Sequence, residues 1–333
     1  MCYIGWVSKA LAVLAAGALA LLSACGKQAD TAEPESLRIG FLDDPLASLL
    51  YVAQEKGMFQ HRNLKVTFRN YEGGAYAVRD LRAGELEVAV CTEFVLALQG
   101  FRGSELRTIG TIATADNVEV IARADRGIRL PEDLRGRKVG VSKGMNTEFL
   151  LGSFLAFHGL RPRDVRIVDH NPSALVAALA SGEVDAACLY PPFSYASKRS
   201  LGGQALSWAA QGGQDYFFLL TTSTDLLKAR PRAFRELLAA LLEAETYLAG
   251  HEAEVRELLA RRFGLASGPL AERLAQIRFQ VGLNQELLTV MEDEAHWAMA
   301  NGVVESAVAP NLFLALSLEP LETLKPDAVG VIH

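Results

Sequence analysis

Apolar and polar positions alternate in two ways along the first third of the chain. Short runs rich in apolar and β-branched residues at 37–42, 64–69 and 87–91 predict strands. Between them, residues 46–59 and 74–83 carry apolar side chains at the three- and four-residue spacing of a helix. Strands that alternate with helices predict βαβ units and a parallel sheet.

The same order of elements occurs a second time. Residues 179–187 (LASGEVDAA) repeat the pattern of residues 81–89 (LRAGELEVA), and Gly84 or Gly182 stands where the preceding helix should end. The second set comprises strands at 137–141, 164–169 and 185–189 and helices at 144–158 and 172–181. We therefore predict an α/β fold class with two βαβ-based lobes.

Two further strand-like runs, 118–123 and 216–221, lead into and out of the second set, and we expect the chain to cross between the lobes there. The remainder is predicted to be mostly helical, at 231–249, 251–263, 269–281 and 284–300. This division assigns 37–120 and 222–333 to lobe 1 and 121–221 to lobe 2.

The first residues have the pattern of an export signal. The apolar run at 10–22 is shorter than the roughly 20 residues that cross a bilayer, and small residues lead from it to Cys25. Residues 22–25 (LSAC) resemble the lipobox of bacterial lipoproteins, which implies that a signal peptide of residues 1–24 is removed and Cys25 is acylated. An uncleaved helical anchor is the alternative. Residues 25–36 lack large apolar side chains and predict a flexible tether.

Composition narrows the function classes. The 333-residue chain carries a net charge of −6 and has no basic block, so nucleic acid is not an expected partner. Beyond the signal and Cys25, Cys91 and Cys188 remain, both at the ends of apolar runs, and we expect two buried thiols rather than a disulfide. The six histidines are scattered, so we expect no metal site and no cofactor.

Three segments carry a family resemblance. Residues 51–59 (YVAQEKGMF), 81–89 and 131–141 (PEDLRGRKVGV) are similar in order and spacing to motifs of nitrate/sulfonate/taurine-type substrate-binding proteins, in the NMT1/THI5-like superfamily. The resemblance covers roughly residues 37–220. It implies a two-lobed periplasmic binding protein of type II, a monomer, that closes on a small molecule and delivers it to an ABC permease with its cytoplasmic ATPase. With the lipobox, it implies an extracytoplasmic protein held on a bacterial membrane.

Ligands of open α/β sheets bind beyond the carboxyl ends of the strands, which places the expected site between the lobes. The candidate residues there, most of which follow a strand, are Asp43, Asp44, Tyr71, Gly73, Gly74, Thr92, Glu93, Ser142, Lys143, Gly144, Asn146, Thr147, Asn171, Tyr190 and Asp215. The segment 142–147 opens a helix, whose free N–H groups and dipole favour an anion. Alternatively, Ser142 or Asn146 only caps that helix.

The acidic and aromatic candidates leave two interpretations open. Glu93 can accept a hydrogen bond from a ligand amine or stabilise the start of its own helix. Tyr71 and Tyr190 can pack on a ligand or serve in ordinary packing. If Glu93 and an aspartate both face the cleft, a bare anion such as nitrate is disfavoured and a zwitterion or a ring with donors fits better.

Other functions have weaker support. Residues 140–144 match G-x-S-x-G, the nucleophile elbow of serine hydrolases, with Ser142 as the nucleophile. However, no HGGG-type oxyanion segment is present, so we expect a binder and not an enzyme. Synthases of the thiamin pyrimidine precursor belong to the same superfamily, but Cys91 stands alone here and Ala47 lies where those proteins have a histidine-containing segment. A lipoprotein that passes its ligand to a sensor, and a binder of the thiamin precursor, remain alternatives.

Overall fold

The computed structural model describes residues 33–103 and 105–332. The expected signal peptide, the lipidation site Cys25 and most of the expected tether therefore lie outside the described residues. The first strand begins at Glu35, so Ser36, expected in the tether, already belongs to a strand. Residues from Glu35 onward form one unit of the chain, whose described part holds two larger sheets and one two-stranded sheet.

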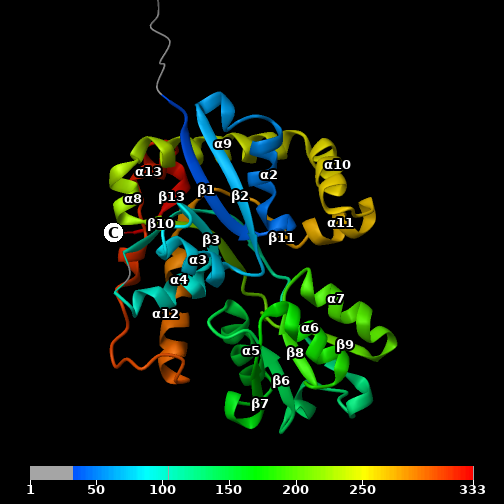
Figure 1. Ribbon diagram of the computed structural model, residues 1–333. Coiled ribbons are helices and arrows are strands. Elements are labelled where there is room, and N and C mark those ends of the chain that lie inside the picture. The colour runs from blue at the N-terminus through cyan, green and yellow to red at the C-terminus, as the bar shows by residue number, and fades with distance from the viewer. Residues whose placement is uncertain (1–32, 104, 333) are drawn as a thin grey trace, which may run out of the picture. The chain divides into compact units, whose positions relative to one another are not determined.

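The strands and helices follow the predicted alternation (Figure 1). The strands are β1 (Glu35–Leu42), β2 (Leu64–Tyr71), β3 (Val88–Thr92), β4 (Leu106–Ala115), β5 (Glu119–Arg123), β6 (Lys138–Val141), β7 (Arg166–Asp169), β8 (Ala186–Leu189), β9 (Ala205–Ala209), β10 (Tyr216–Ser223), β11 (Ile277–Arg278), β12 (Leu283–Asn284) and β13 (Val329–Gly330). The helices are α2 (Ser48–Glu55), α3 (Gly74–Arg82), α4 (Glu93–Gly100), α5 (Asn146–Phe157), α6 (Pro172–Ser181), α7 (Phe193–Leu201), α8 (Thr224–Ala229), α9 (Pro231–Gly250), α10 (Glu252–Phe263), α11 (Ser267–Leu274), α12 (Gln285–Ala300) and α13 (Glu319–Glu322).

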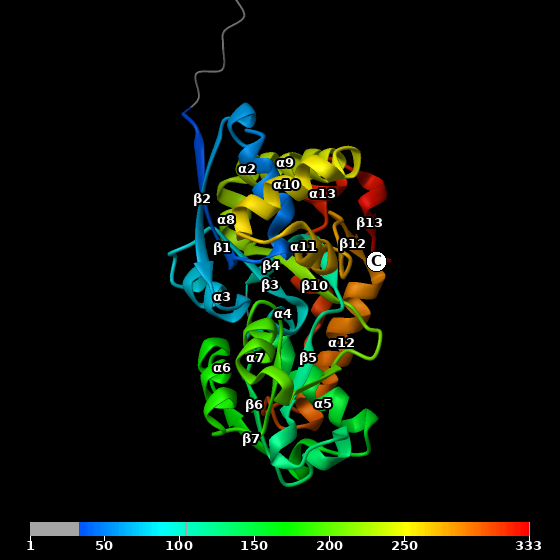
Figure 2. The same ribbon diagram turned by 90° about the vertical axis from the view of Figure 1, so that its right-hand side faces the viewer.

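The two larger sheets of the described residues share one design. The six-stranded sheet has the order β11-β4-β10-β3-β1-β2, and the five-stranded sheet has the order β7-β6-β8-β5-β9. In each, three strands of one repeat pair in parallel, and antiparallel strands extend the sheet on one side. Figures 1 and 2 show the five-stranded sheet, in green, below the six-stranded one. The predicted duplication of a βαβαβ unit is confirmed.

The chain passes between the sheets at two short segments. Residues 116–118 connect β4 to β5, and residues 210–215 connect β9 to β10. The run 216–221, which the sequence placed in lobe 2, instead forms most of β10 and pairs with β3 and β4 in the six-stranded sheet. Burial explains why this run joins the six-stranded sheet. The strand β10 is buried along almost its whole length, as a strand inserted between two others must be.

Several elements differ from the prediction. The strands β4 and β9 and the helix α7 were not predicted, whereas a helix starting at Glu93 was expected and is α4. The helix expected at 269–281 ends at Leu274, and the chain then adds the short strand β11 to the edge of the six-stranded sheet. The helix expected at 46–59 is α2, which ends at Glu55 just before Gly57, whose φ of 69° lies in the left-handed region that favours glycine.

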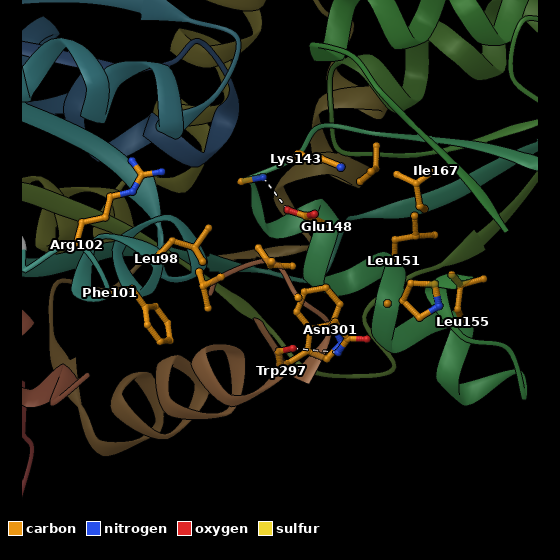
Figure 3. A pocket seen from close by; sticks show the side chains of 17 residues that line it. Leu98, Phe101, Arg102, Lys143, Glu148, Leu151, Leu155, Ile167, Trp297 and Asn301 are labelled. Carbon is orange, nitrogen blue, oxygen red and sulfur yellow. Dashed lines mark hydrogen bonds between the residues drawn. The ribbon is translucent and has the colours of Figure 1, made fainter. Parts of the chain in front are cut away.

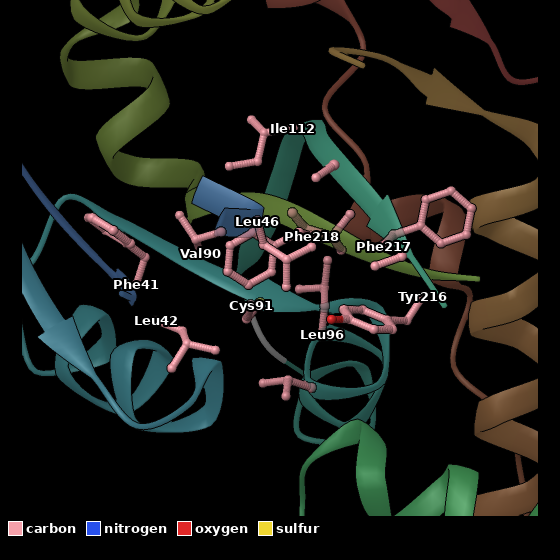
Figure 4. Packing of buried hydrophobic residues seen from close by; sticks show 14 of the residues in the cluster. Phe41, Leu42, Leu46, Val90, Cys91, Leu96, Ile112, Tyr216, Phe217 and Phe218 are labelled. Atoms are coloured by element: carbon pink, nitrogen blue, oxygen red, sulfur yellow. The ribbon is translucent and has the colours of Figure 1, made fainter. Parts of the chain in front are cut away.

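The main core lies on the six-stranded sheet. Phe41, Val90, Ile112 and Phe218 come from β1, β3, β4 and β10 and meet in one apolar cluster (Figure 4). These strands carry apolar residues on both faces because helices cover the sheet on both sides. A smaller cluster, which includes Leu175, packs α6 on the five-stranded sheet. The cluster in Figure 4 supports the end of the six-stranded sheet that faces the second sheet.

Candidate ligand-binding cleft

A small cavity lies between the two sheets. Its volume is about 20 Å³, enough for roughly one water molecule. It is lined by Leu42, Leu46, Gly73, Gly74, Thr92, Val95, Met145, Asn146, Tyr190, Tyr216 and Phe218. Both repeats contribute, because the first residues of α3 and α4 face the start of α5 and the residue that follows β8. The structure therefore shows a cleft whose two walls are in contact. We call it the cleft cavity below.

Glycine is required where α3 begins. A Cβ atom on Gly74 would lie 2.5 Å from Cα of Cys91, so only glycine lets α3 start directly against β3. A Cβ atom on Gly73 would lie 2.8 Å from both Met145 Cε and Tyr190 Oη. Gly73 therefore marks the point where the two walls of the cleft come closest.

The helices that start at the cleft cavity have uncapped ends. The N-cap residues of α3, α4 and α5 are Gly73, Thr92 and Met145, and none makes a side-chain capping hydrogen bond. The Thr92 hydroxyl is buried and has no hydrogen-bond partner among the described residues. A helix N-terminus presents free N–H groups and a positive partial charge, so this convergence is suited to an anion.

Hydrogen bonds also cross the cleft at Glu72. The Tyr190 hydroxyl donates to the carbonyl oxygen of Glu72 at 2.6 Å. The Ser173 N–H, in the first turn of α6, donates to Glu72 Oε2 at 3.3 Å. A carboxylate at a helix N-terminus is favourable. Glu72 was not among the residues singled out from the sequence, although it lies between two of them.

Glu93 lies behind the cleft cavity and does not line it. It is 1% exposed, and its Oε2 accepts a hydrogen bond from the Phe217 N–H at 2.7 Å. Its neighbour Glu294, on α12, is equally buried, and its Oε2 has no partner within the described part of the chain. Burial raises the pKa of Glu93 to about 8. Burial and the Glu93 charge also raise the pKa of Glu294 well above its ordinary value.

Asp44 is a second buried carboxyl near the cleft. Its Oδ1 accepts a hydrogen bond from the Leu46 N–H at 3.1 Å and so caps the short 3₁₀ turn Pro45–Ala47. Burial raises the pKa of Asp44 to about 7, although the Leu46 hydrogen bond opposes the rise. It does not line the cleft cavity, but the lining residues Leu42 and Leu46 flank it in the chain.

The residues expected at the site separate into two groups. Those that line the cleft cavity are Gly73, Gly74, Thr92, Asn146 and Tyr190. The others are Asp43, Asp44, Tyr71, Glu93, Ser142, Lys143, Gly144, Thr147, Asn171 and Asp215, which do not line it.

Several of this second group have partners within their own lobe. Asp43 pairs with Tyr51 and Arg262, Tyr71 donates to Asp80, Asn171 caps α6, and Asp215 pairs with Arg278. Thr147 is buried, and its hydroxyl, like that of Thr92, has no partner among the described residues. Lys143 and Gly144 line a different cavity.

Sequence reasoning missed the apolar side of the cleft cavity. Val95 and Met145 lie within three residues of predicted positions, so helical spacing was an available signal for them. Tyr216 and Phe218 reach the cavity only because β10 pairs with β3, more than 120 residues away in the chain. No local sequence pattern predicts that pairing.

The hydrolase alternative finds no supporting geometry at Ser142. Its hydroxyl donates to the backbone carbonyl of His170 at 2.8 Å, while Nε2 of the His170 ring lies 2.9 Å from Glu183. A nucleophile needs a base within hydrogen-bond reach, and the described residues around Ser142 provide none.

The two cysteines of the described residues are buried thiols. Neither Cys91 nor Cys188 forms a disulfide, and both are buried, as predicted. Burial raises the pKa of the Cys91 thiol to about 12, which makes it unreactive.

The described residues hold neither a metal-binding cluster nor a helix that could cross a membrane. No group of three or more His, Cys, Asp or Glu side chains there is arranged to hold a metal ion. None of the helices in the described ranges has the length and apolar character needed to cross a membrane.

Solved structures share this fold. The alkanesulfonate-binding protein SsuA from Xanthomonas axonopodis pv. citri, bound to MOPS, superposes with a TM-score of 0.72. The two chains are 24% identical, and the match covers 86% of this chain and 99% of that one. The desulfurization enzyme DSZB has the same fold, with a TM-score of 0.61 at 18% identity over 87% of this chain and 98% of that one. The fold alone therefore does not separate binders from enzymes.

Sequence comparison is more specific. The taurine-binding periplasmic protein of Escherichia coli is 27% identical over 164 residues, which cover 49% of this chain and 50% of that protein. The family model described as NMT1/THI5 like matches residues 45–255, well over half of the chain. The match includes the first repeat apart from β1, the whole second repeat and both segments that pass between the sheets. The chain belongs to the NMT1/THI5-like family.

Proposed function

We propose that this protein is an extracytoplasmic solute-binding protein that captures a small organic anion or zwitterion between its two sheets and delivers it to an ABC importer. The observation that carries the proposal is the convergence of three uncapped helix N-termini on one cavity whose walls come from both repeats. The named relatives support a sulfonate-like ligand, since two of them bind an alkanesulfonate and taurine.

The lining of the cleft cavity indicates the form of the ligand. The N–H groups at the helix starts, with the Thr92 hydroxyl and Asn146, would hold the anionic group. Leu42, Leu46 and Phe218 offer an apolar wall for its carbon body. No lysine or arginine side chain is among the lining residues, so the anion would be held by backbone and hydroxyl donors. A short alkanesulfonate combines both features.

Ligand entry requires the walls of the cleft to separate, because a cavity of about 20 Å³ cannot hold a molecule of several heavy atoms. The segments 116–118 and 210–215 are short connections between the sheets and are the natural hinge. We assign 35–115 and 216–332 to one lobe and 119–209 to the other. The ligand can drive closure only through contacts that it makes better in the closed state.

The membrane attachment rests on the sequence. Acylation of Cys25, after removal of residues 1–24, would anchor the domain through the segment that ends at Pro34. The anchor would keep the ligand-binding domain near a permease and its ATPase. Labelling of cells with an alkyne fatty acid tests this proposal: the wild-type protein should be labelled and Cys25→Ser should not. Equal labelling of both would contradict it.

A thermal-shift screen tests the binding function. The panel should hold short alkanesulfonates, taurine, nitrate, carboxylates and pyrimidines, each with the wild-type protein and Thr92→Val. A ligand at 100 times its dissociation constant adds about 2.7 kcal/mol to the unfolding free energy, which a melting curve detects easily. We expect a sulfonate or amino-sulfonate hit that weakens in Thr92→Val. A panel without hits, or hits equally strong in both proteins, would contradict the proposed site.

A further inference from the structure

A second and larger cavity lies where α4, α5 and α12 meet (Figure 3). Its volume is about 520 Å³, within the range of about 300–1,000 Å³ typical of small-molecule sites. The C-terminal ends of α4 and α12 form one side, and one face of α5 with β7 forms the other. It shares no lining residue with the cleft cavity. We call it the α5–α12 cavity.

The apolar wall of this cavity is built around one glycine. Leu151, Gly152 and Leu155 lie on one face of α5, and the indole of Trp297 packs against Gly152. A Cβ atom at residue 152 would lie 2.2 Å from Cζ2 of Trp297, so only glycine allows this contact. Phe149 holds the indole from one side at a ring-centroid distance of 5.4 Å. The wall is therefore a fixed, flat, partly exposed aromatic surface.

The α5–α12 cavity is lined by two cationic side chains, one carboxylate and the amide of Asn301. Arg102 and Lys143 line it, both are exposed, and neither side chain forms an ion pair or hydrogen bond with any residue that the structure describes. The carboxylate on the wall, Glu148, already accepts a hydrogen bond from the Gly144 N–H at 2.8 Å. Asp169, whose Oδ1 accepts a hydrogen bond from the Lys143 N–H at 3.0 Å, is a second engaged carboxylate nearby. Within the described residues, Arg102 and Lys143 are therefore the charged side chains of this cavity that are free to pair with an anion.

We propose that the α5–α12 cavity is a second ligand site, which takes an organic anion with an apolar body, such as a medium-length carboxylate. Arg102 on the α4 side or Lys143 on the α5 side pairs with the anionic group, and the carbon body lies against Trp297 and the face of α5. The volume, the aromatic wall and the unpaired charges together carry this proposal. It does not depend on which ligand the cleft binds.

Titration calorimetry of the full chain with octanoate and with 1-octanol tests whether the cationic side chains contribute to ligand binding. We expect octanoate to bind more tightly than octanol. Arg102→Gln and Lys143→Gln should each weaken octanoate about two- to fivefold, the usual effect of one exposed ion pair, and leave octanol unchanged. Arg129→Gln and Lys65→Gln remove equally exposed charges elsewhere and are the matched controls. Both should bind octanoate like the wild type.

A variant that fills the α5–α12 cavity tests whether octanoate binds there. Val304 lines the cavity and is half-buried, so Val304→Trp should abolish octanoate binding, whereas Val308→Trp, at a residue 75% exposed, should not. Octanoate bound equally well by the wild type, the charge variants and Val304→Trp would overturn the proposal, as would the absence of binding to the wild type. Binding that is lost in Gly73→Val but kept in Val304→Trp would place octanoate in the cleft, which overturns this site and supports the proposed function.

Discussion

Thr92 shows how one side chain can be prepared for a ligand. Its buried hydroxyl has no partner within the described residues, and leaving a polar atom unsatisfied costs about 1–3 kcal/mol. Thr222 is the contrast, because its buried hydroxyl donates to the Glu87 carbonyl oxygen at 2.7 Å. Two threonines of the same core thus differ in whether the folded protein already uses their hydroxyls.

Substitution of these threonines by valine should separate stability from binding. Thr92→Val removes an unsatisfied group, so the unfolding free energy should stay level or rise, while ligand affinity falls about five- to tenfold. Thr222→Val breaks a made hydrogen bond, so it should lose about 1–3 kcal/mol of stability and keep its affinity. Urea denaturation measures the unfolding free energy of each variant, and titration calorimetry measures its ligand affinity. A loss of affinity in Thr222→Val alone would show that Thr92 does not contact the ligand.

The pair Glu93 and Glu294 predicts how stability depends on pH. Their pKa values are raised above the ordinary 4.5 in the folded state, so the native protein holds more protons than the unfolded chain between pH 4.5 and about 8. Stability should therefore be highest below pH 4.5 as far as this pair is concerned, and should fall as the pH rises towards 8.

Glu294→Gln isolates this effect, because glutamine can still donate to Glu93 but cannot ionise. At pH 8 the variant should be more stable than the wild type by about 1 kcal/mol or more, and the difference should shrink at pH 5. Glu292→Gln, at an exposed position on the same helix, should track the wild type at both values. Urea denaturation at pH 5 and pH 8 is the measurement. A constant difference at both pH values would show that the pair does not titrate in this range.

At the scale of elements, the packing of α3 on β3 positions the cleft. The Gly74 Cα faces the backbone of Cys91, which cannot move aside as a flexible side chain can. Gly74→Ala should therefore cost about 1–3 kcal/mol, the usual penalty of overpacking. Gly110→Ala is the matched control, since its added Cβ would meet nothing closer than 3.5 Å. Chemical denaturation compares the two. Equal stability of both variants would mean that α3 shifts freely on the sheet.

The elements also show what the sequence could predict. The repeat at 81–89 and 179–187 predicted two matching units, and Gly84 and Gly182 have positive φ values of 76° and 80° at the predicted helix ends. These features are local, so a local pattern contains them. The strands β4 and β9 join their sheets by pairing with distant segments, and no short window of sequence specifies such partners.

The candidate site follows the same division. Gly73, Thr92 and Asn146 could be predicted as site residues because each lies between the end of a strand and the first turn of the next helix. Glu93 stands in the same kind of place, yet it lies against Glu294, about 200 residues away in the chain, rather than in the cleft cavity. A carboxylate at a helix start has the same local sequence pattern whether it lines the cleft cavity or is buried against another helix. Only the position of α12 decides between them.

At the scale of the whole molecule, Glu72 joins the two lobes. Its carboxylate accepts from the first turn of α6, and its carbonyl accepts from Tyr190. A carboxylate near a helix N-terminus contributes about 0.3–1 kcal/mol, so Glu72→Gln should open the cleft more often and speed ligand release about two- to fivefold. Stopped-flow dissociation measures this rate, with Glu132→Gln as an exposed control. An unchanged rate would show that this contact does not hold the cleft closed.

The central claim is that a small anion binds between the two lobes, and Gly73 tests it most directly. A side chain there would meet Met145 and Tyr190 across the cleft and keep the walls apart. The measurement is a calorimetric titration of the best sulfonate from the screen into the wild type and Gly73→Val. We predict one binding site in the wild type and a loss of at least about tenfold in affinity in the variant, equivalent to about 1.4 kcal/mol, with little change in melting temperature. Equal affinity in the two proteins would place the ligand elsewhere and contradict the account.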